Sequence, residues 1–237
     1  MTFASKLLET QQQLKKIIQE HRSVSFANSL GAEDMVLMDL ITKHAPSIEI
    51  FSIDTGRLPA ETYDLIERAI KHYRRKIIVY FPEQSAVENF VRINGINGFR
   101  DSIAQRQDCC RARKVEPLQR ALKGKAAWIT GLRREQAVTR KNLSASEFDQ
   151  ANGLQKYNPL IEWSEEDVWN YIDEFNVPYN ALHDKGYPSI GCAPCTRAIE
   201  PGEDVRAGRW WWESAEQKEC GLHVKKTDDN HDVSVLS

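Results

Sequence analysis

Four of the five cysteines fall into two pairs whose spacing could hold a metal. Cys109 and Cys110 are adjacent, and Cys192 and Cys195 are separated by two residues. Four thiolates complete either a zinc site or an iron–sulfur cluster, although a Cys-x-x-Cys pair is also typical of a redox dithiol. Adjacent ligands strain a single tetrahedral ion, whereas a cubane distributes its ligands over several iron atoms. The two pairs therefore mildly favour an iron–sulfur cluster over zinc, with two pairs of buried free thiols as the remaining alternative.

The fifth cysteine, Cys220, lies apart from these pairs in the segment Glu-Cys-Gly-Leu-His, which ends at His223. A lone cysteine with a nearby histidine is a candidate nucleophile. His223 and the upstream Arg206 and Arg209 could lower the pKa of this thiol and raise its thiolate fraction at neutral pH. Cys220 is thus a candidate reactive thiol; the alternative is an inert cysteine close to a polar tail.

Three loops carry residues suited to binding an anion. They cover residues 28–34, 54–59 and 130–136, and a further arginine follows the third. Small residues let backbone N–H groups approach an anion at a helix N-terminus, and guanidinium groups donate paired hydrogen bonds to phosphate or sulfate. A glycine turn needed for packing, or a solvated charged turn, would look the same in any one loop. The candidate substrate-binding residues are Ser29, Gly31, Asp34, Asp54, Thr55, Gly56, Arg57, Arg133, Arg134 and Arg140.

Alternating strands and helices must position these loops. Apolar residues recur at helical spacing over residues 5–21, and short β-rich runs then alternate with helical ones. This alternation predicts βαβ units and a mostly parallel sheet, at whose carboxyl edge the loops would meet. Ser164 followed by Asp167 predicts one more helix start, and regular structure is hard to predict beyond residue 180. The expected strands are 23–27, 48–53, 76–81 and 126–130, and the expected helices are 34–43, 60–72, 87–93 and 115–122.

The whole-chain composition is that of a soluble globular protein. The 237 residues are 41% hydrophobic and 28% charged, and the formal net charge is −2. That balance argues against a protein that coats nucleic acid, which needs a strong basic excess. No run of about 18 apolar residues predicts a membrane span, and no export signal is recognised. We expect one domain over residues 1–223, a flexible tail over 224–237 and a cytoplasmic location, where cysteines serve as metal ligands or reactive thiols.

Seven segments taken together resemble the assimilatory adenylylsulfate (APS) reductases, within the wider PAPS reductase family. They are SLGAED at 29–34, DTGRLPAETY at 54–63, CCRARK at 109–114, TGLRREQ at 130–136, SIGCAPCTR at 189–197, PGEDVRAGRWWWE at 201–213 and KECGLH at 218–223. The resemblance extends over nearly the whole chain. Cluster-free PAPS reductases keep the terminal segment but lack the two cysteine pairs, so the chain resembles the iron–sulfur-containing branch.

The resemblance implies a Rossmann-like, adenine-nucleotide α-hydrolase-like fold with a mobile C-terminal segment. It also implies an enzyme of sulfate assimilation and cysteine biosynthesis, in which Cys220 attacks APS and forms an S-sulfo intermediate. A thiol of thioredoxin or a glutaredoxin would then release sulfite. A [4Fe-4S] cluster would organise and polarise the sulfate end rather than donate electrons. The cluster ligands would be Cys109, Cys110, Cys192 and Cys195, and the phosphosulfate site would be lined by Lys114, Arg206, Arg209 and His223.

Several alternatives stay open. The enzyme could use PAPS or both nucleotides, because one or two pocket residues can accept or reject a 3′-phosphate. An ATP pyrophosphatase with zinc on the four cysteines, or a non-enzymatic iron–sulfur sensor, would not need Cys220. The first two loops match neither a P-loop nor Gly-x-Gly-x-x-Gly, which disfavours a conventional ATPase or a dinucleotide dehydrogenase. A homo-oligomer is compatible with the resemblance. Of the tryptophans at 210–212, at least two are expected to pack in the core.

Overall fold

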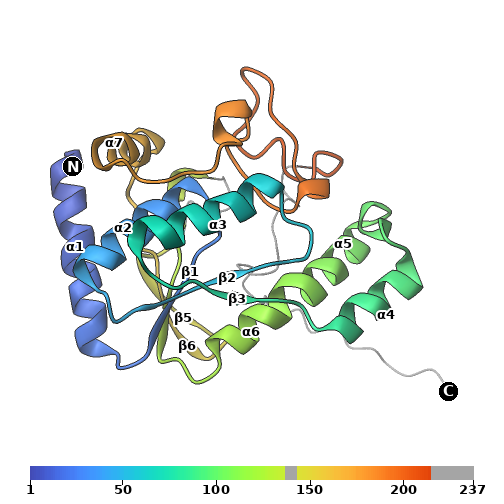
Figure 1. Cartoon of the computed structure of the whole chain (residues 1–237), viewed down its shortest axis with the longest axis horizontal. Coiled ribbons are helices and arrows are strands. Elements are labelled where there is room, and N and C mark those ends of the chain that lie inside the picture. The colour runs from blue at the N-terminus through green and yellow to red at the C-terminus, as the bar shows by residue number, and fades with distance from the viewer. Residues whose placement is uncertain (137–142, 215–237) are drawn as a thin grey trace.

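The computed structural model describes residues 1–136 and 143–214, and its centre is a single sheet (Figure 1). Within these residues the sheet has six strands in the order β3-β2-β1-β4-β6-β5. Neighbouring strands are parallel except at one edge, where β5 runs antiparallel to β6. The strands are β1 Val24–Ala27, β2 Glu49–Ile53, β3 Ile78–Tyr80, β4 Ala127–Ile129, β5 Ser146–Asp149 and β6 Leu154–Tyr157.

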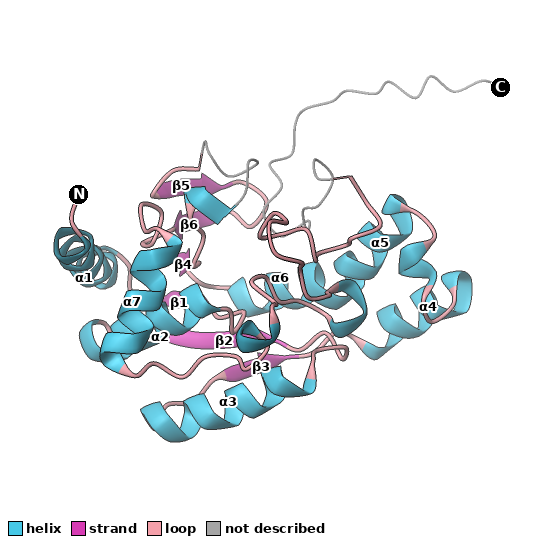
Figure 2. Ribbon diagram, turned by 90° about the horizontal axis from the view of Figure 1, so that it is seen from above, coloured by secondary structure: helices cyan, strands magenta, loops and turns pink. Residues whose placement is uncertain are grey.

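Helices cover both faces of the sheet. Four of them, α1, α2, α3 and α7, pack their buried apolar side chains against one face in the larger core cluster. On the opposite face α6 forms a smaller cluster with the strands, and α5 and α4 lie beyond it (Figure 2). The helices are α1 Phe3–Glu20, α2 Ala32–His44, α3 Ala60–Tyr73, α4 Gln84–Asn94, α5 Ile103–Cys110, α6 Glu116–Leu122 and α7 Glu165–Phe175.

Neighbouring side chains of the central strands enter opposite cores. In β2, Ile50 belongs to the larger cluster and Phe51 to the smaller one, and in β4 Ile129 and Trp128 divide in the same way. This division follows from the two-residue period of a pleated strand. A parallel sheet covered by helices has both faces buried. Side chains that reach a ligand must therefore come from the strand ends and the loops that follow them.

The predicted alternation of strands and helices is confirmed. Each expected strand overlaps one of β1 to β4, and each expected helix overlaps α1, α2, α3, α4 or α6. The predicted helix start at Ser164 is also present. The Ser164 hydroxyl accepts a hydrogen bond from the Asp167 N–H at 3.1 Å, and the Asp167 carboxylate accepts one from the Ser164 N–H at 2.7 Å. This reciprocal pair satisfies two N–H groups that have no partner within the helix.

Other elements have no counterpart in the prediction. Helix α5 has few large apolar residues and so gives no clear periodicity, and it continues into a π-helical turn at Arg111–Val115. The β5–β6 hairpin consists of short strands rich in polar residues. In the described part of the chain beyond residue 180, the helical elements are two short 3-10 turns, at His183–Lys185 and Ala193–Cys195. The expected tail at 224–237 lies outside the described residues.

None of the described helices is both long enough and apolar enough to span a bilayer.

We expect Ser164→Ala to lower the free energy of unfolding by about 1 kcal/mol, because the variant loses the side-chain cap of α7. Urea denaturation would measure the change. Ser164→Thr keeps the capping oxygen and is the matched control, with an expected loss of a few tenths of a kcal/mol. An alanine variant as stable as the parent would show that water replaces the cap without cost.

Candidate active site

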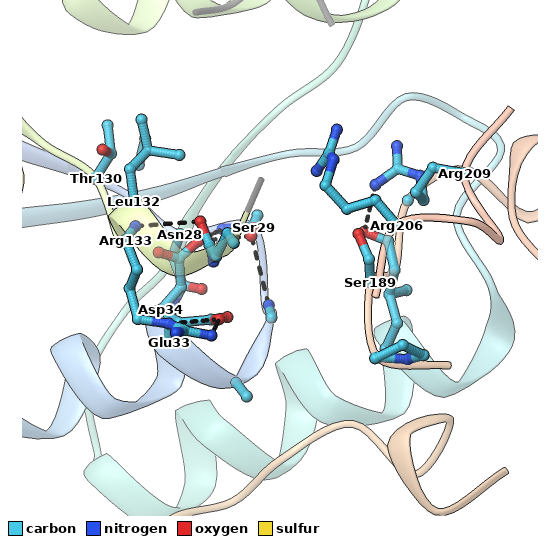
Figure 3. Close-up of a pocket in the computed structure, with 18 of the residues that line it drawn as sticks. Asn28, Ser29, Glu33, Asp34, Thr130, Leu132, Arg133, Ser189, Arg206 and Arg209 are labelled. Carbon is cyan, nitrogen blue, oxygen red and sulfur yellow. Dashed lines mark hydrogen bonds and ion pairs between the residues drawn. The ribbon is translucent and has the colours of Figure 1, made fainter. Parts of the chain in front are cut away.

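A cavity of about 610 Å³ opens at the carboxyl ends of β1 and β4. These neighbouring strands are not consecutive in the chain, so the sheet order reverses between them. Ligands of open parallel sheets bind at such a point, since the loops on either side lead away in opposite directions. Figure 3 shows the two walls of the cavity: Asn28, Ser29, Asp34 and Arg133 on one side, and Ser189, Arg206 and Arg209 on the other.

The loop after β1 is held by its own side chains. The Leu30 N–H donates to the Asn28 side-chain oxygen at 2.7 Å, which supports the left-handed backbone of Leu30, with φ of 66°. The Ser29 N–H and hydroxyl both donate to the Asp34 carboxylate, at 2.7 and 2.6 Å. Helix α2 begins just after Gly31, so its unpaired N–H groups face the cavity edge. The predicted residues Ser29, Gly31 and Asp34 therefore come together.

Asp34 also fixes the loop after β4. A Cβ atom added at Gly131 would overlap the Asp34 carboxylate, so only glycine allows the two loops to approach this closely. Burial raises the pKa of Asp34 to about 6, and hydrogen bonds from the Ser29 hydroxyl and N–H oppose that rise. The carboxylate thus joins two loops that are about 100 residues apart in the sequence.

Arg133 and Arg134 point in different directions. Arg133 is buried and lines the cavity, where its guanidinium donates to the Glu33 carboxylate at 2.8 and 3.0 Å. Burial favours the neutral form of Glu33, but the Arg133 charge and hydrogen bonds outweigh it and hold the Glu33 pKa below its usual range. Arg134 is half-exposed, pairs with Glu162 and is not among the cavity residues. The structure brings Arg133 into the site and does not bring Arg134.

The loop after β2 is organised by Asp54. Its carboxylate accepts hydrogen bonds from the Gly56 N–H at 2.7 Å and from the Tyr63 hydroxyl at 2.9 Å. Asp54 is buried and is not among the residues that line the cavity. Gly56 has a φ of +70°, which favours glycine. Asp54 and Gly56 therefore shape the loop, and Thr55 and Leu58 are the residues of this loop that line the larger cavity.

Thr55 and Arg57 lie next to the predicted metal ligands. The Thr55 hydroxyl is 3.2 Å from the Cys192 sulfur, and the Thr55 carbonyl accepts a hydrogen bond from Arg113 at 2.7 Å. Arg57 lines a second, small cavity with the cysteines, and its guanidinium also donates to the Asn97 side chain at 2.9 Å. Arg57 was grouped with the substrate-binding residues, whereas the structure places it beside the cysteines.

All four paired cysteines line this second cavity, which we call the cysteine cavity. Two come from the end of α5, and two come from the turn at 192–195. The side chains around them are mostly basic or aromatic. The lining residues are Arg57, Phe99, Arg106, Cys109, Cys110, Arg113, Lys114, Cys192, Pro194, Cys195 and Trp210.

The donor set of the cysteine cavity fits an iron–sulfur cluster. Burial raises the pKa of Cys195 to about 11, with Lys114 and Arg209 opposing the rise, so positive charge is needed to keep such thiols ionised. The four thiols line one common cavity, and thiolates are the ligands that hold iron–sulfur clusters.

Lys114 and Trp210 line both cavities. Lys114 lies in the π-helical turn that follows Cys110, and π-helical turns are frequent at functional sites. Trp210 is fully buried against Cys110, while Trp211 is 39% exposed and Trp212 is partly buried, so the expectation that at least two tryptophans pack inward fits. The two cavities therefore share a wall only one layer of side chains thick.

Arg206 and Arg209 complete the basic end of the larger cavity. Arg209 is buried, and its guanidinium donates to the Ile190 carbonyl at 3.2 Å and lies 4.7 Å from the Trp210 ring centre. A Cβ atom at Gly191 would overlap that guanidinium. Lys114, Arg206 and Arg209, which the resemblance assigns to the phosphosulfate site, thus line one cavity, and their roles stay a prediction. Cys220, His223 and Arg140 lie outside the described residues, and their roles stay predictions.

The sequence did not indicate the apolar wall of the larger cavity. Phe51, Leu118 and Trp128 belong to the smaller core cluster and also line the cavity. Their only signal was an apolar position inside predicted strands and helices, which core residues share. His183 and Gln136 also line the cavity and were not singled out.

Comparisons with known proteins agree with this geometry. The model of the phosphoadenosine phosphosulfate reductase domain matches residues 23–198. An adenosine 5′-phosphosulfate reductase from Allochromatium vinosum is 59% identical over 90% of this chain and 83% of its own length. One from Burkholderia cepacia is 54% identical over 89% and 84%. A crystal structure of phosphoadenylyl-sulfate reductase from Candida auris, a phosphate complex, is 30% identical with a TM-score of 0.69, covering 81% of this chain and 90% of that one.

The mostly parallel sheet, with its cavity at the β1–β4 reversal, is the fold shared with the phosphoadenylyl-sulfate reductase from Candida auris, an adenine-nucleotide α-hydrolase-like fold. The relatives named above are oxidoreductases. The chain belongs to the phosphoadenosine phosphosulfate reductase family. The resemblance and the fold class drawn from the sequence are therefore confirmed.

The raised pKa of Asp34 gives a pH dependence of stability. Between about pH 4 and 6 the folded chain holds a proton on Asp34 that the unfolded chain, with an ordinary pKa of 3.8, has released. This group's contribution therefore falls as the pH rises through that window. We expect the free energy of unfolding of the parent, minus that of Asp34→Asn, to fall by on the order of 1–3 kcal/mol from pH 4 to pH 6. Urea denaturation at several pH values measures it, and a flat difference would contradict it.

Proposed function

We propose that this protein reduces adenosine 5′-phosphosulfate to sulfite and AMP in sulfate assimilation. The observation that carries the proposal is the shared wall of Lys114 and Trp210, which sets the basic end of a nucleotide-sized cavity against four cysteines. Two relatives that are more than half identical are adenosine 5′-phosphosulfate reductases, which supports the same substrate. We further propose that the working unit is one domain over residues 1–223, in the reducing cytosol.

The nucleotide would lie along the cavity with its base at the apolar wall. Phe51, Leu118 and Trp128 line the cavity with apolar side chains suited to an adenine ring. The anionic phosphosulfate would lie at the basic end, where Arg206 and Arg209 can each donate more than one hydrogen bond. Arg133 would act differently. Its charge is balanced by Glu33, so it holds the loops in place rather than adding to anion binding.

In the first step, the Cys220 thiolate attacks the sulfur of the phosphosulfate. A bond forms between the two sulfur atoms, and the bond from sulfur to the bridging oxygen breaks. The electron pair of that bond stays on the phosphate oxygen of the departing AMP. Lys114, Arg206 and Arg209 would stabilise the growing negative charge, an effect typically worth about 10²–10³ in rate for one donor. His223, three residues beyond the nucleophile, would assist the thiolate or contact the sulfonate.

In the second step, a dithiol protein of the thioredoxin or glutaredoxin class supplies two electrons. One of its thiolates attacks the Cys220 sulfur, and sulfite leaves with the electron pair of the sulfur–sulfur bond. The second thiol of the donor then resolves the mixed disulfide and regenerates the Cys220 thiolate. APS and one dithiol are thereby converted to AMP, sulfite and one disulfide, with two protons released.

A [4Fe-4S] cluster would be held by Cys109, Cys110, Cys192 and Cys195. When bound it would organise and polarise the wall next to the sulfate end, and it would not need to donate electrons, because the electrons of the reaction come from thiols. The chain's own residues prepare that place. The Thr55 hydroxyl contacts Cys192, and Arg113 ties the π-helical turn to the Thr55 carbonyl. These contacts fix Lys114 between the two cavities.

The function is tested by sulfite release from APS with reduced thioredoxin. Cys220→Ser should lower kcat by on the order of 10⁴ or more, because the nucleophile is lost. AMP binding should remain within about twofold, since AMP lacks the sulfonate group that the thiol attacks. Mass spectrometry should detect an added SO₃ group on the peptide containing Cys220 in the parent alone.

The control for this test is the choice of nucleotide and donor. PAPS assayed beside APS measures the preference as a ratio of kcat/KM values, and omission of thioredoxin should stop turnover after one SO₃ transfer. Full activity of Cys220→Ser would sink the proposed mechanism. Release of pyrophosphate from ATP would favour the ATP pyrophosphatase alternative.

The cofactor is tested by metal content. Anaerobically purified parent should contain iron and acid-labile sulfide and show broad visible absorbance, and Cys192→Ser should lose most of both because one ligand is missing. Ser52→Ala, at a buried strand position away from the cysteine cavity, is the control and should keep its iron. Stoichiometric zinc without iron in the parent would contradict the cluster.

A further inference from the structure

An ion pair buried behind the cysteine cavity joins two distant parts of the chain. The Arg106 Nε donates to both carboxylate oxygens of Glu213, at 2.7 and 3.0 Å. The two side chains are only 1% and 4% exposed. Burying two charges is costly unless the geometry is good, and removal of one partner leaves the other charge uncompensated. A pair of this kind fixes the relative position of the elements that carry it.

Arg106 is built into the helix that carries two of the cysteines. It lies in α5, three residues before Cys109, and its guanidinium lines the cysteine cavity. The guanidinium carbon also lies 4.6 Å from the centre of the Trp210 ring, which belongs to the wall shared by the two cavities. The position of Arg106 is therefore set by the same helix that sets Cys109 and Cys110.

Glu213 ends a segment that is attached to the other cysteine pair. The Trp210 N–H donates to the Cys195 carbonyl at 3.1 Å, and the Arg197 N–H donates to the Gly208 carbonyl at 3.0 Å. The Glu213 N–H closes a turn onto the Trp210 carbonyl at 2.8 Å. The chain thus passes from the Cys192–Cys195 turn to Glu213 through backbone contacts, and the Arg106 ion pair then joins it to α5.

Glu213 is also close along the chain to the proposed nucleophile. Cys220 lies seven positions further along the chain, and a chain of that length spans at most about 25 Å. The direction in which the chain leaves Glu213 therefore affects which positions the thiol can occupy. A misplacement of about 1 Å in a reacting group can cost about 10²-fold in rate.

We propose that Arg106 is a positioning residue that acts through Glu213. It aligns the start of the segment carrying Cys220 with the cysteine cavity and with Lys114. The Nε–H shared between both carboxylate oxygens suits this role, because a planar guanidinium donates in fixed directions and so restrains the orientation of Glu213 as well as its distance. This inference rests on the proposed function for its kinetic test and on the geometry above for its structural test.

The test compares Glu213→Gln with Glu147→Gln. The control residue forms a partly buried pair with Lys156 at 3.1 Å in the β5–β6 hairpin, and neither of these two side chains lines either cavity. For Glu213→Gln we expect kcat to fall about 10- to 100-fold, with the KM for APS changed less than about twofold and iron content unchanged. For Glu147→Gln we expect both constants to stay within about twofold of the parent. Trypsin should cut after Lys218 several-fold faster in Glu213→Gln only.

Two further variants separate positioning from simple stability. Arg106→Lys keeps the charge but replaces the planar guanidinium, whose donors point in fixed directions, with a flexible ammonium group, so its kcat should fall while the protein stays folded. The double variant Arg106→Met with Glu213→Leu removes both charges and should regain thermal stability relative to Glu213→Gln. Its kcat should stay low, because apolar packing lacks the directional bonds.

Three results would overturn the proposal. A kcat within twofold of the parent in Glu213→Gln would leave the pair a structural role only. A kcat that recovers with stability in the double variant would mean the same. A kcat that falls in step with iron content would assign the pair to cluster retention. Those results are kinetic and require an active parent; if the parent does not reduce APS, the proposed function fails.

The trypsin test does not depend on activity. Equal cleavage rates after Lys218 in Glu213→Gln and Glu147→Gln would therefore overturn the positioning role in that case too.

Discussion

The whole site depends on the reversal of strand order between β1 and β4. Strands on either side of that point lead their chains in opposite directions, so neither loop covers the gap and a cavity is left at the sheet edge. Asp34 joins the two loops across this point. Its carboxylate accepts hydrogen bonds from Ser29 in the loop after β1, and Gly131 in the loop after β4 packs against it so closely that only glycine fits. A buried carboxylate at the mouth of an anion site is otherwise unfavourable, which indicates how much the closeness of the two loops matters.

Buried arginines in this protein divide into two groups by their partners. Arg133 and Arg106 each face a glutamate, and both pairs join segments about 100 residues apart in sequence. Arg209 instead rests on a tryptophan ring and a backbone carbonyl, which leave its charge unneutralised by a carboxylate in the described part of the chain. Arg133 and Arg106 thus hold two segments together through an ion pair, whereas Arg209 contributes its positive charge to the larger cavity. Only the partner distinguishes these uses.

The sequence could predict much of this arrangement and not all of it. Strand and helix periodicity located β1 to β4, and the chemistry of thiols was enough to group Cys109 and Cys110 with the distant Cys192 and Cys195, which do share a cavity. Adjacent arginines were treated alike, yet the backbone at 133–134 sends one inward and the other to Glu162. Periodicity did not predict helix α5, which has few large apolar residues and makes tertiary contacts such as the Arg106–Glu213 ion pair. Contacts between residues far apart in sequence leave no local pattern.

The π-helical turn at Arg111–Val115 joins α5 and α6 without a loop between them. A turn that takes in an extra residue rotates everything beyond it relative to an uninterrupted α-helix. This continuous helix can therefore present Cys109 and Cys110 to the cysteine cavity, while Leu118, further along, faces the sheet and the larger cavity. The one extra residue in the π-helical turn sets the rotation of α6 relative to α5 about the helix axis. Deletions or insertions in this turn should therefore be tolerated far less well than substitutions. A deletion would rotate either Cys109 and Cys110 away from the cysteine cavity or Leu118 away from the larger cavity.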